Sequence, residues 1–161
     1  MAIKMIRQEG DPALRQVAKP VPEVNSHIQK LLTDLAETMY DAGNGIGLAA
    51  PQIGILKRCI VVDVGDGSGL IELVNPEVVS AEGEQFGPEG CLSMPGKSGD
   101  VMRANHVIIK GWNREGQEIT VAGEGLLARC LLHEIDHLDG ILFTDRVLPV
   151  GGPNKTYGKK R

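Results

Sequence analysis

Hydrophobic residues in two stretches of the chain recur at the spacing of a helix face. In the stretch that begins at Ser26 they fall every three or four positions, which places them on one side of an α-helix. These residues are Ile28, Leu31, Leu32, Leu35 and Met39. We expect this helix to end at Asp41-Ala42-Gly43. The same spacing returns in a segment that begins around residues 123–125 and ends at Gly140, and it predicts a second long helix.

A shorter helix is predicted near the start of the chain. Asp11 can cap its first turn, and Pro12 suits the first helical position. The helix would run through Leu14 and Val17. It must stop before Pro20, whose ring cannot continue the hydrogen bonds of a helix.

Between the two long helices, β-branched and alternating residues predict strands. Their ranges are 59–64, 70–74, 77–81, 101–112 and 118–121. Glycine-rich and asparagine-containing turns separate several of these strands. We expect 101–112 to form one long strand.

The order of these elements indicates the fold class. Strands that are grouped together, rather than alternating with helices, are typical of an α+β fold. We expect mainly antiparallel strands packed around the central C-terminal helix. The 161 residues contain no repeat or linker and are enough for a buried core, so we predict a single domain over 1–161. Within it, we expect residues 148–161 to form a flexible basic tail.

Composition and charge narrow the class of protein. The net charge of −4 and the pI near 5.6 argue against direct DNA binding, because nucleic-acid binders usually carry a basic surplus. No apolar run approaches the ~20 residues that cross a membrane, and residues 1–7 lack the apolar core of a secretory signal. Three cysteines at irregular spacing favour a reducing compartment over a disulfide framework, so we expect the cytoplasm.

The predicted C-terminal helix carries the sequence His133-Glu134-Ile135-Asp136-His137. Two histidines four residues apart lie on one helix face, about 6 Å apart along the axis, so both rings can reach one metal ion. Glu134 projects to the side, where it can exchange a proton with a water but cannot bind the same ion. This pattern is typical of metal-dependent hydrolases, in which two ligands and one carboxylate share a helix.

A hydrolytic metal ion usually has three protein ligands, so a third ligand is needed. Phe143 occupies the position where some metalloproteases have a third histidine. Cys130 lies on nearly the same helix face, but about 10.5 Å of helix separates it from His137, so it cannot share an ion with both histidines. Cys91 lies in a loop rich in Gly and Pro, residues 87–96, which can approach a metal held by another segment. We therefore favour a Cys,His,His ligand set.

A glycine-rich segment precedes Gln52. Three glycines within residues 43–47 allow a substrate or another strand to come close to the backbone. The side-chain amide of Gln52 is a neutral donor, and a hydrolase that forms a tetrahedral oxyanion needs such donors near its metal.

Three motifs, in this order, resemble the signature motifs of the peptide deformylases. They are GIGLAAPQ at 45–52, EGCLS at 89–93 and HEIDHLDG at 133–140. The resemblance covers most of the chain, roughly residues 11–147. It implies an enzyme that hydrolyses the N-formyl group of N-formylmethionyl peptides of newly made proteins and releases formate.

The resemblance also implies the metal and its ligands. Cys91, His133 and His137 would bind one divalent ion, and Glu134 would be the general acid and base. The ion implied is Fe²⁺, with Zn²⁺, Ni²⁺ or Co²⁺ able to take its place.

Other residues of the motifs would hold the substrate. Gln52 and the backbone N–H of Leu92 would bind the oxyanion. Gly47 would pair with the substrate backbone, while Ile46 and Glu89 would line the region that takes methionine. The implied partners are N-formylmethionyl nascent peptides, and a contact with the ribosome stays open.

Two positions depart from the pattern of this family. Leu132 stands where many relatives have Gln, which removes a polar contact beside the ligand His133 but not the chemistry. Arg129, a residue of the substrate-binding region, is long and charged where an apolar residue is common. We expect its stem to line the pocket and its charged head to reach water.

Two other functions stay open at this point. A zinc endopeptidase would use the same helix, and it would cleave internal peptide bonds but not formyl-Met peptides. A non-catalytic metal-binding or interaction module would bind the metal without releasing formate.

Overall fold

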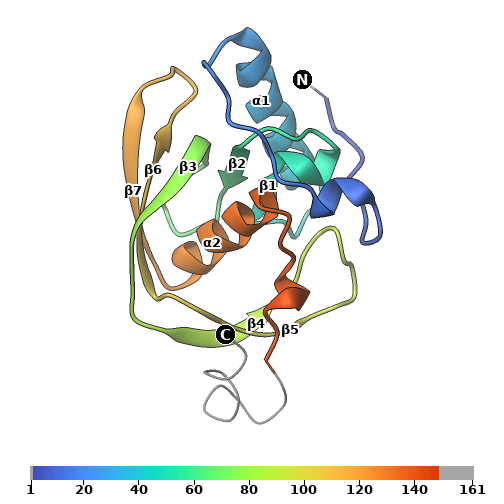
Figure 1. Cartoon of the computed structure of the whole chain (residues 1–161), viewed down its shortest axis with the longest axis vertical. Coiled ribbons are helices and arrows are strands. Elements are labelled where there is room, and N and C mark those ends of the chain that lie inside the picture. The colour runs from blue at the N-terminus through green and yellow to red at the C-terminus, as the bar shows by residue number, and fades with distance from the viewer. Residues whose placement is uncertain (1, 149–161) are drawn as a thin grey trace.

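A computed structural model of the chain describes residues 2–148 (Figure 1). Within these residues it contains two α-helices, seven strands and three short 3-10 turns. The helices are α1 (Ser26–Asp41) and α2 (Leu126–Leu138). The strands are β1 (Gly47–Ala49), β2 (Cys59–Val62), β3 (Ile71–Glu82), β4 (Gln85–Glu89), β5 (Gly99–Arg103), β6 (His106–Trp112) and β7 (Glu118–Glu124). The 3-10 turns are Pro12–Arg15, Ala50–Ile53 and Phe143–Asp145.

The strands form two sheets. Five of them pair in the order β1-β2-β3-β6-β7, and β4 pairs with β5 in a separate two-stranded sheet. All of the strand pairings between these elements are antiparallel. The predicted α+β class with mainly antiparallel strands is therefore confirmed.

Helix α1 has the bounds that its apolar spacing predicted. Its buried side chains include Ile28, Leu32 and Leu35, and they belong to a core cluster shared with β1 and β2. The side chain of Asn25, just before the helix, accepts a hydrogen bond from the backbone N–H of Ile28 at 3.1 Å. This cap satisfies one of the donors that every helix start leaves without a helical partner.

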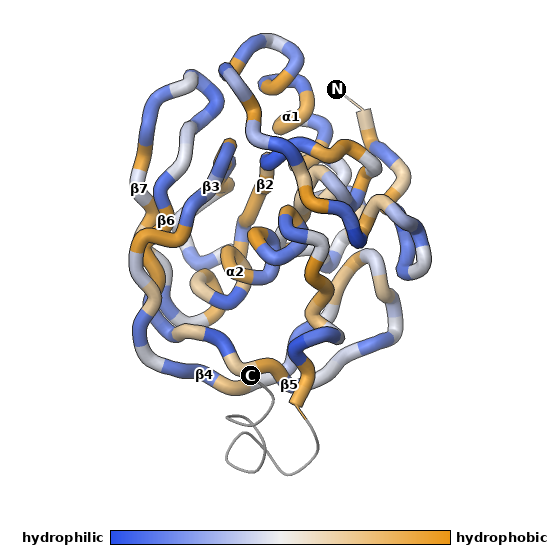
Figure 2. Tube along the Cα trace, viewed as in Figure 1, coloured by the Kyte–Doolittle hydropathy of each residue, from blue (hydrophilic) through white to orange (hydrophobic). Residues whose placement is uncertain are grey.

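Helix α2 is buried on almost all of its sides. Only Leu126 and Leu132 of its thirteen residues are not buried, and the helix packs against β1, β2 and β7. Figure 2 nevertheless shows both hydrophobic and hydrophilic residues along α2. Buried polar side chains need partners, so this helix must carry a polar network or a site.

The predicted helix near the start of the chain is much shorter than expected. Asp11 does cap it, by accepting a hydrogen bond from Ala13 N–H, but only a 3-10 turn over Pro12–Arg15 forms. The chain then extends, because Ala18 N–H donates to Leu138 O and Lys19 pairs with the segment around Lys57. Tertiary hydrogen bonds thus replace the later turns of the predicted helix.

The single strand predicted for 101–112 is wrong. The structure divides it into β5 and β6, which belong to different sheets. The break lies at Asn105, whose backbone N–H donates to Glu82 O and whose carbonyl accepts from Gly125 N–H. Strand β4 also occupies the beginning of the stretch at 87–96 that was predicted as a loop.

The C-terminal part of the described chain runs past α2 to the two-stranded sheet (Figure 1). Leu148, the first residue of the predicted tail, is buried, and its N–H donates to Asp100 O at 3.0 Å. The rest of that predicted tail, 149–161, lies outside the described residues. None of the helices within residues 2–148 has the length and apolar character that a membrane span requires.

Candidate metal centre and active site

Three segments that are distant in the sequence meet at one cavity of about 460 Å³. Residues within 44–52, 88–97 and 126–134 form its wall. The first two segments contain the first two motifs, and the third segment contains the start of the third motif, His133 and Glu134. All of the site residues predicted from the motifs line this cavity except His137, which joins the site through its contact with Cys91.

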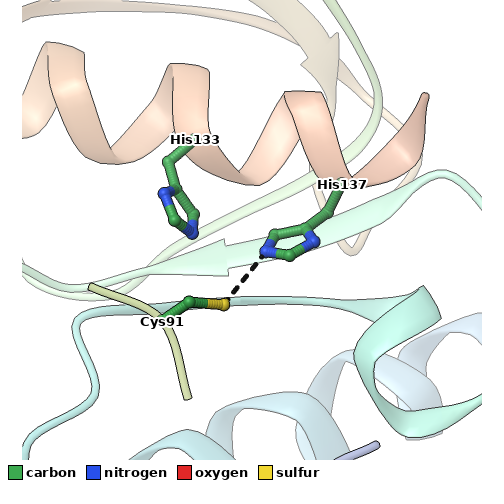
Figure 3. Close-up of side chains that lie close together, drawn as sticks. All are labelled: Cys91, His133 and His137. Atoms are coloured by element: carbon green, nitrogen blue, oxygen red, sulfur yellow. Dashed lines mark hydrogen bonds between the residues drawn. The ribbon is translucent and has the colours of Figure 1, made fainter. Parts of the chain in front are cut away.

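Cys91, His133 and His137 lie close together (Figure 3). Their candidate ligand atoms are all within 4.8 Å of one another, and Cys91 Sγ is 3.4 Å from His137 Nε2. Ligand atoms bound to one tetrahedral ion at about 2.0–2.3 Å lie about 3.3–3.6 Å apart. The Cys91–His137 distance falls in this range, and all three candidate ligand atoms are close enough to face one small divalent ion. Nitrogen and sulfur ligands also suit such an ion.

Glu89 determines the orientation of the His133 ring. Its Oε1 lies 2.9 Å from His133 Nδ1. Burial by itself would raise the pKa of Glu89, but hydrogen bonds from Arg103 and His133 hold this pKa well below its usual value. An ionised carboxylate only accepts, so Nδ1 carries a proton. Burial would lower the pKa of His133, but hydrogen bonds with Cys91 and Glu89 raise this pKa to about 10, so a metal bound at Nε2 would displace a proton from it. A ligand histidine held by a carboxylate is a common arrangement in metal sites.

His137, unlike His133, is neutral before any metal binds. Burial lowers the pKa of this ring far below its usual value, and the neighbouring His133 lowers it further. A neutral imidazole offers the lone pair that a metal needs. Its Nδ1 is buried and has no hydrogen-bond partner among residues 2–148.

A chain of buried ion pairs supports Glu89. Arg103 donates two hydrogen bonds to its carboxylate, at 2.7 and 2.8 Å, and a third to Asp136 at 2.7 Å. Asp136 in turn accepts two hydrogen bonds from Arg146. Each buried charge therefore has an opposite charge and hydrogen bonds, without which its burial would be very unfavourable.

Glu134 lies between the metal centre and β1. Burial is the main reason why its pKa is raised to about 7, and its Oε1 has no hydrogen-bond partner among the described residues. Strand β1 can come this close only because residue 47 is glycine. A Cβ on Gly47 would lie 2.6 Å from Glu134 Oε2 and 2.8 Å from Cys130 Sγ, closer than real atoms approach.

The side chain of Gln52 is fixed at both ends of its amide. Its Oε1 accepts from Ala49 N–H at 3.0 Å, so the amide nitrogen must point the other way. That nitrogen lies 3.1 Å from Ser93 Oγ and 3.4 Å from Cys91 Sγ. An amide donor is therefore held next to the three candidate ligands.

The other predicted residues lie at the cavity in different ways. Ile46 and Leu92 line it, and the Ile46 carbonyl accepts a weak hydrogen bond from Cys130 Sγ at 3.3 Å. Cys130 is buried and does not belong to the ligand cluster, in agreement with the helix geometry. Leu132 packs against the hydrophobic core.

The expectation that the head of Arg129 reaches water is wrong. Arg129 is only 7% exposed, and its guanidinium lies 2.8 Å from Glu89 Oε2. It also donates to Val101 O at 3.1 Å. An ion pair and backbone carbonyls inside the protein take the place of water around this head.

Several residues at the site were missed by the sequence analysis. Ser93 and Asp136 lie inside the motifs, and this position could have identified them as site residues. Arg103 and Gln85 lie outside the motifs, and their contacts join residues 14 or more positions apart. Nothing in the local pattern points to these two.

Comparisons with known proteins agree with the motifs. The family model of the polypeptide deformylases matches residues 3–151. A peptide deformylase of Acetivibrio thermocellus is 59% identical over 148 residues, which cover 92% of this chain and 85% of the relative. A peptide deformylase of Halothermothrix orenii is 54% identical over 151 residues, which cover 94% of this chain and 97% of the relative.

The fold agrees as well. The crystal structure of a peptide deformylase from Thermotoga maritima superimposes with a TM-score of 0.88 at 39% sequence identity. The match covers 92% of this chain and 100% of that chain. The chain therefore belongs to the polypeptide deformylase family, metal-dependent hydrolases that remove the N-formyl group from newly made peptides.

Proposed function

We propose that Cys91, His133 and His137 hold one divalent metal ion in this chain and that Glu134 transfers the protons of the deformylation reaction. The observation that carries this proposal is the convergence of the three ligand atoms within 4.8 Å of one another, at the wall of the cavity. A buried carboxylate oxygen of Glu134 that lacks a partner among the described residues lies beside them. The chemistry that a bound ion supplies is Lewis acidity, which polarises the formyl carbonyl and makes a water more acidic.

The protein residues would carry out the remaining steps. Glu134 would accept a proton from the attacking water and return it to the amine nitrogen when the formyl carbon–nitrogen bond breaks. The amide of Gln52 and the backbone N–H of Leu92 would donate hydrogen bonds to the oxyanion that forms on the formyl oxygen. The hydrogen bond from Ala49 to Gln52 keeps that donor aimed at the site before the substrate arrives.

The substrate would bind along strand β1. This strand lies at the edge of the five-stranded sheet, so its outer side can accept a peptide as an added strand. Gly47 would pair with the peptide backbone, and Ile46, Glu89 and Arg129 would line the part of the cavity that takes the methionine side chain. Backbone pairing gives affinity with little choice among the following residues.

Ferrous iron is the ion that we propose, with zinc, nickel or cobalt as replacements. One thiolate and two imidazoles suit all four ions.

We propose N-formylmethionyl nascent peptides as the substrates and the cytoplasm, where peptides are made, as the location. A ribosome contact is a further proposal. We also propose that 1–161 is a single catalytic domain, because one cavity gathers all three motifs.

An anaerobic assay tests this proposal directly. Formate release from formyl-Met-Ala-Ser is measured on protein whose metal content is determined in the same sample. We expect formate in proportion to bound metal and none after treatment with a chelator. The same peptide without its formyl group is the matched control.

The two rival functions give different results in this assay. Cleavage of internal peptide bonds without formate would indicate an endopeptidase. A full complement of metal with no formate would indicate a binding module. Either result would contradict the proposed function.

A further inference from the structure

Strand β4 forms one wall of the cavity but contributes almost nothing to the hydrophobic core. Its Phe86 and Pro88 are exposed. The positions that alternate with them, and so share the opposite face, are Gln85, Gly87 and Glu89. Gln85 and Glu89 are polar, and Gly87 has no side chain that could pack. Packing of the side chains of β4 itself therefore contributes little to holding this strand against helix α2.

One side chain contacts all three of those positions. Arg129, on α2, donates from Nε to Gln85 Oε1 at 3.3 Å, and from Nη1 to Gly87 O at 3.3 Å. The same Nη1 lies 2.8 Å from Glu89 Oε2. A planar guanidinium with donors on several sides can make these contacts at once. A Cβ on Gly87 would be 3.6 Å from Nη2, so the guanidinium lies directly against the strand.

Arg129 also reaches the second strand of this sheet. Its Nη1 is 3.1 Å from Val101 O in β5, and Val101 is the residue that pairs with Gly87 across the two strands. The guanidinium therefore sits over one strand pair and holds both strands. Gln85 adds a connection to the start of α2 through Gly125 O at 2.7 Å.

The held strand is a wall of the substrate cavity. Pro88 and Glu89, at the end of β4, line the cavity together with Arg129 and His133 of α2, which Glu89 contacts directly. We infer that Arg129 is a positioning residue that fixes the separation between β4 and α2 and thereby sets the width of the cavity for the first side chain of the substrate. This inference rests on the proposed function, because the cavity is taken to be the substrate site.

Arg129 is separable from the support of the metal ligands. If Arg129 is replaced, Glu89 keeps both hydrogen bonds from Arg103 and its contact with His133. The orientation of His133 should therefore survive, while the wall of the cavity loosens. Binding and selectivity should change, and metal content should not.

The test uses Arg129→Met, which keeps much of the stem and removes every donor, and Arg129→Lys, which keeps the charge at a single point. Kinetics are measured on formyl-Met-Ala-Ser and on the same peptide with Phe in place of Met, with metal content determined alongside. For Arg129→Met we expect KM for the Met peptide to rise about tenfold with little change in kcat. We also expect the preference for Met over Phe to shrink, because a loosened wall admits the larger ring.

A second measurement does not depend on activity. We expect backbone amides of β4 and β5 to exchange with solvent about tenfold faster in Arg129→Met, while those of β6 and β7 keep their rates. Arg129→Lys should show the same changes in smaller measure, because an ammonium cannot span Gln85, Gly87 and Glu89 together. If Arg129→Met does not fold, Arg129→Lys provides the test in its place.

The matched control is Arg114→Met. Arg114 pairs with both oxygens of Glu72 and contacts Thr33, outside the cavity, so its loss should change neither KM, selectivity nor exchange in β4. Normal KM, normal selectivity and normal exchange in the Arg129 variants would overturn the inference. Failure of the wild-type protein to release formate would instead overturn the proposed function, and the exchange data would still decide whether Arg129 holds β4.

Discussion

Glu89 connects a candidate metal ligand to the charged interior of the protein. Its two oxygens accept from Arg103, Arg129 and His133, and all four side chains are buried. Buried ion pairs of this kind add little net stability, because desolvation offsets their attraction. They do hold side chains in fixed orientations, and here they hold the direction of the His133 ring. The structure thus places rigidity where a metal site requires it.

The three cysteines should differ sharply in reactivity. Burial raises the pKa of Cys59 to about 12, and burial together with the charge of Glu134 raises the pKa of Cys130 well above its usual value. Cys91 is partly exposed at the cavity. Because the thiolate is the reactive form, we expect one fast-reacting thiol in folded, metal-stripped protein treated with a thiol reagent near pH 8.

Mass spectrometry identifies the labelled residue. We expect it to be Cys91, with protection when Zn²⁺ is added back and with all three cysteines labelled after denaturation. Rapid labelling of Cys59 in the folded protein would show that its strand is far more open than the structure indicates.

At the residue scale, the sequence predicted the positions that lie within motifs. Cys91, Gln52 and Glu134 were predicted as site residues from local pattern and resemblance, and the structure brings them to one cavity. The environment of Arg129 was predicted wrongly. Its partners, Glu89 and Val101, are 40 and 28 residues away, and no local pattern encodes such distances.

At the scale of elements, helix α2 presents its ligands and its hydrophobic face together. His133 and His137 project from the same side, with ring centroids 5.0 Å apart, while Leu131 and Leu138 pack into the core. The helix starts after Gly125 and is followed by Gly140, both with positive φ. A Cβ on Gly140 would be 2.7 Å from Arg15 O, so a close backbone approach also requires glycine there.

The cap of α1 gives a stability prediction. Replacing Asn25 by Ala removes the hydrogen bond to Ile28 N–H, and we expect a loss of about 1 kcal/mol in the free energy of unfolding. This corresponds to a fall in melting temperature of about 2–4 °C for a chain of this size. Asn25→Asp keeps an acceptor and is the control. Equal melting temperatures for the Ala variant and the wild type would mean that the cap contributes nothing.

Elements with strong periodicity were predicted well, and those that depend on distant partners were not. The apolar spacing predicted the bounds of α1 correctly, because the residues at that spacing form the one helix face that packs on the sheet. The break between β5 and β6 depends on backbone bonds from Asn105 to Glu82 and Gly125. Those bonds join residues that are far apart in the sequence, so the strand-forming residues of 101–112 gave no local sign of the break.

At the scale of the whole molecule, the fold brings together three segments spread over about ninety residues, from 44 to 134. Strand β1 supplies the edge, the segment after β4 supplies Cys91, and α2 supplies the histidines. Each contacts the others mainly through side chains, so the site exists only when the chain is folded as one unit. This supports the proposal of a single domain.

Unfolding measured by two probes tests that proposal. The single tryptophan, Trp112, lies in β6 and reports on the five-stranded sheet, whereas far-ultraviolet circular dichroism reports largely on the helices. We expect the two urea transitions to coincide, as they do for a cooperative domain. Separate midpoints would indicate two units that unfold independently.

Glu134 is the proposed proton acceptor of the reaction, and Glu134→Gln removes that capacity. The amide keeps the size of the side chain beside Gly47 but cannot accept the proton of the attacking water. The variant is assayed anaerobically for formate release from formyl-Met-Ala-Ser, with its metal content measured in parallel. We predict one metal per chain, as in the wild type, and a rate lower by about 10²–10⁴-fold. Formate release at the wild-type rate by a fully metallated Glu134→Gln protein would contradict the role proposed for Glu134.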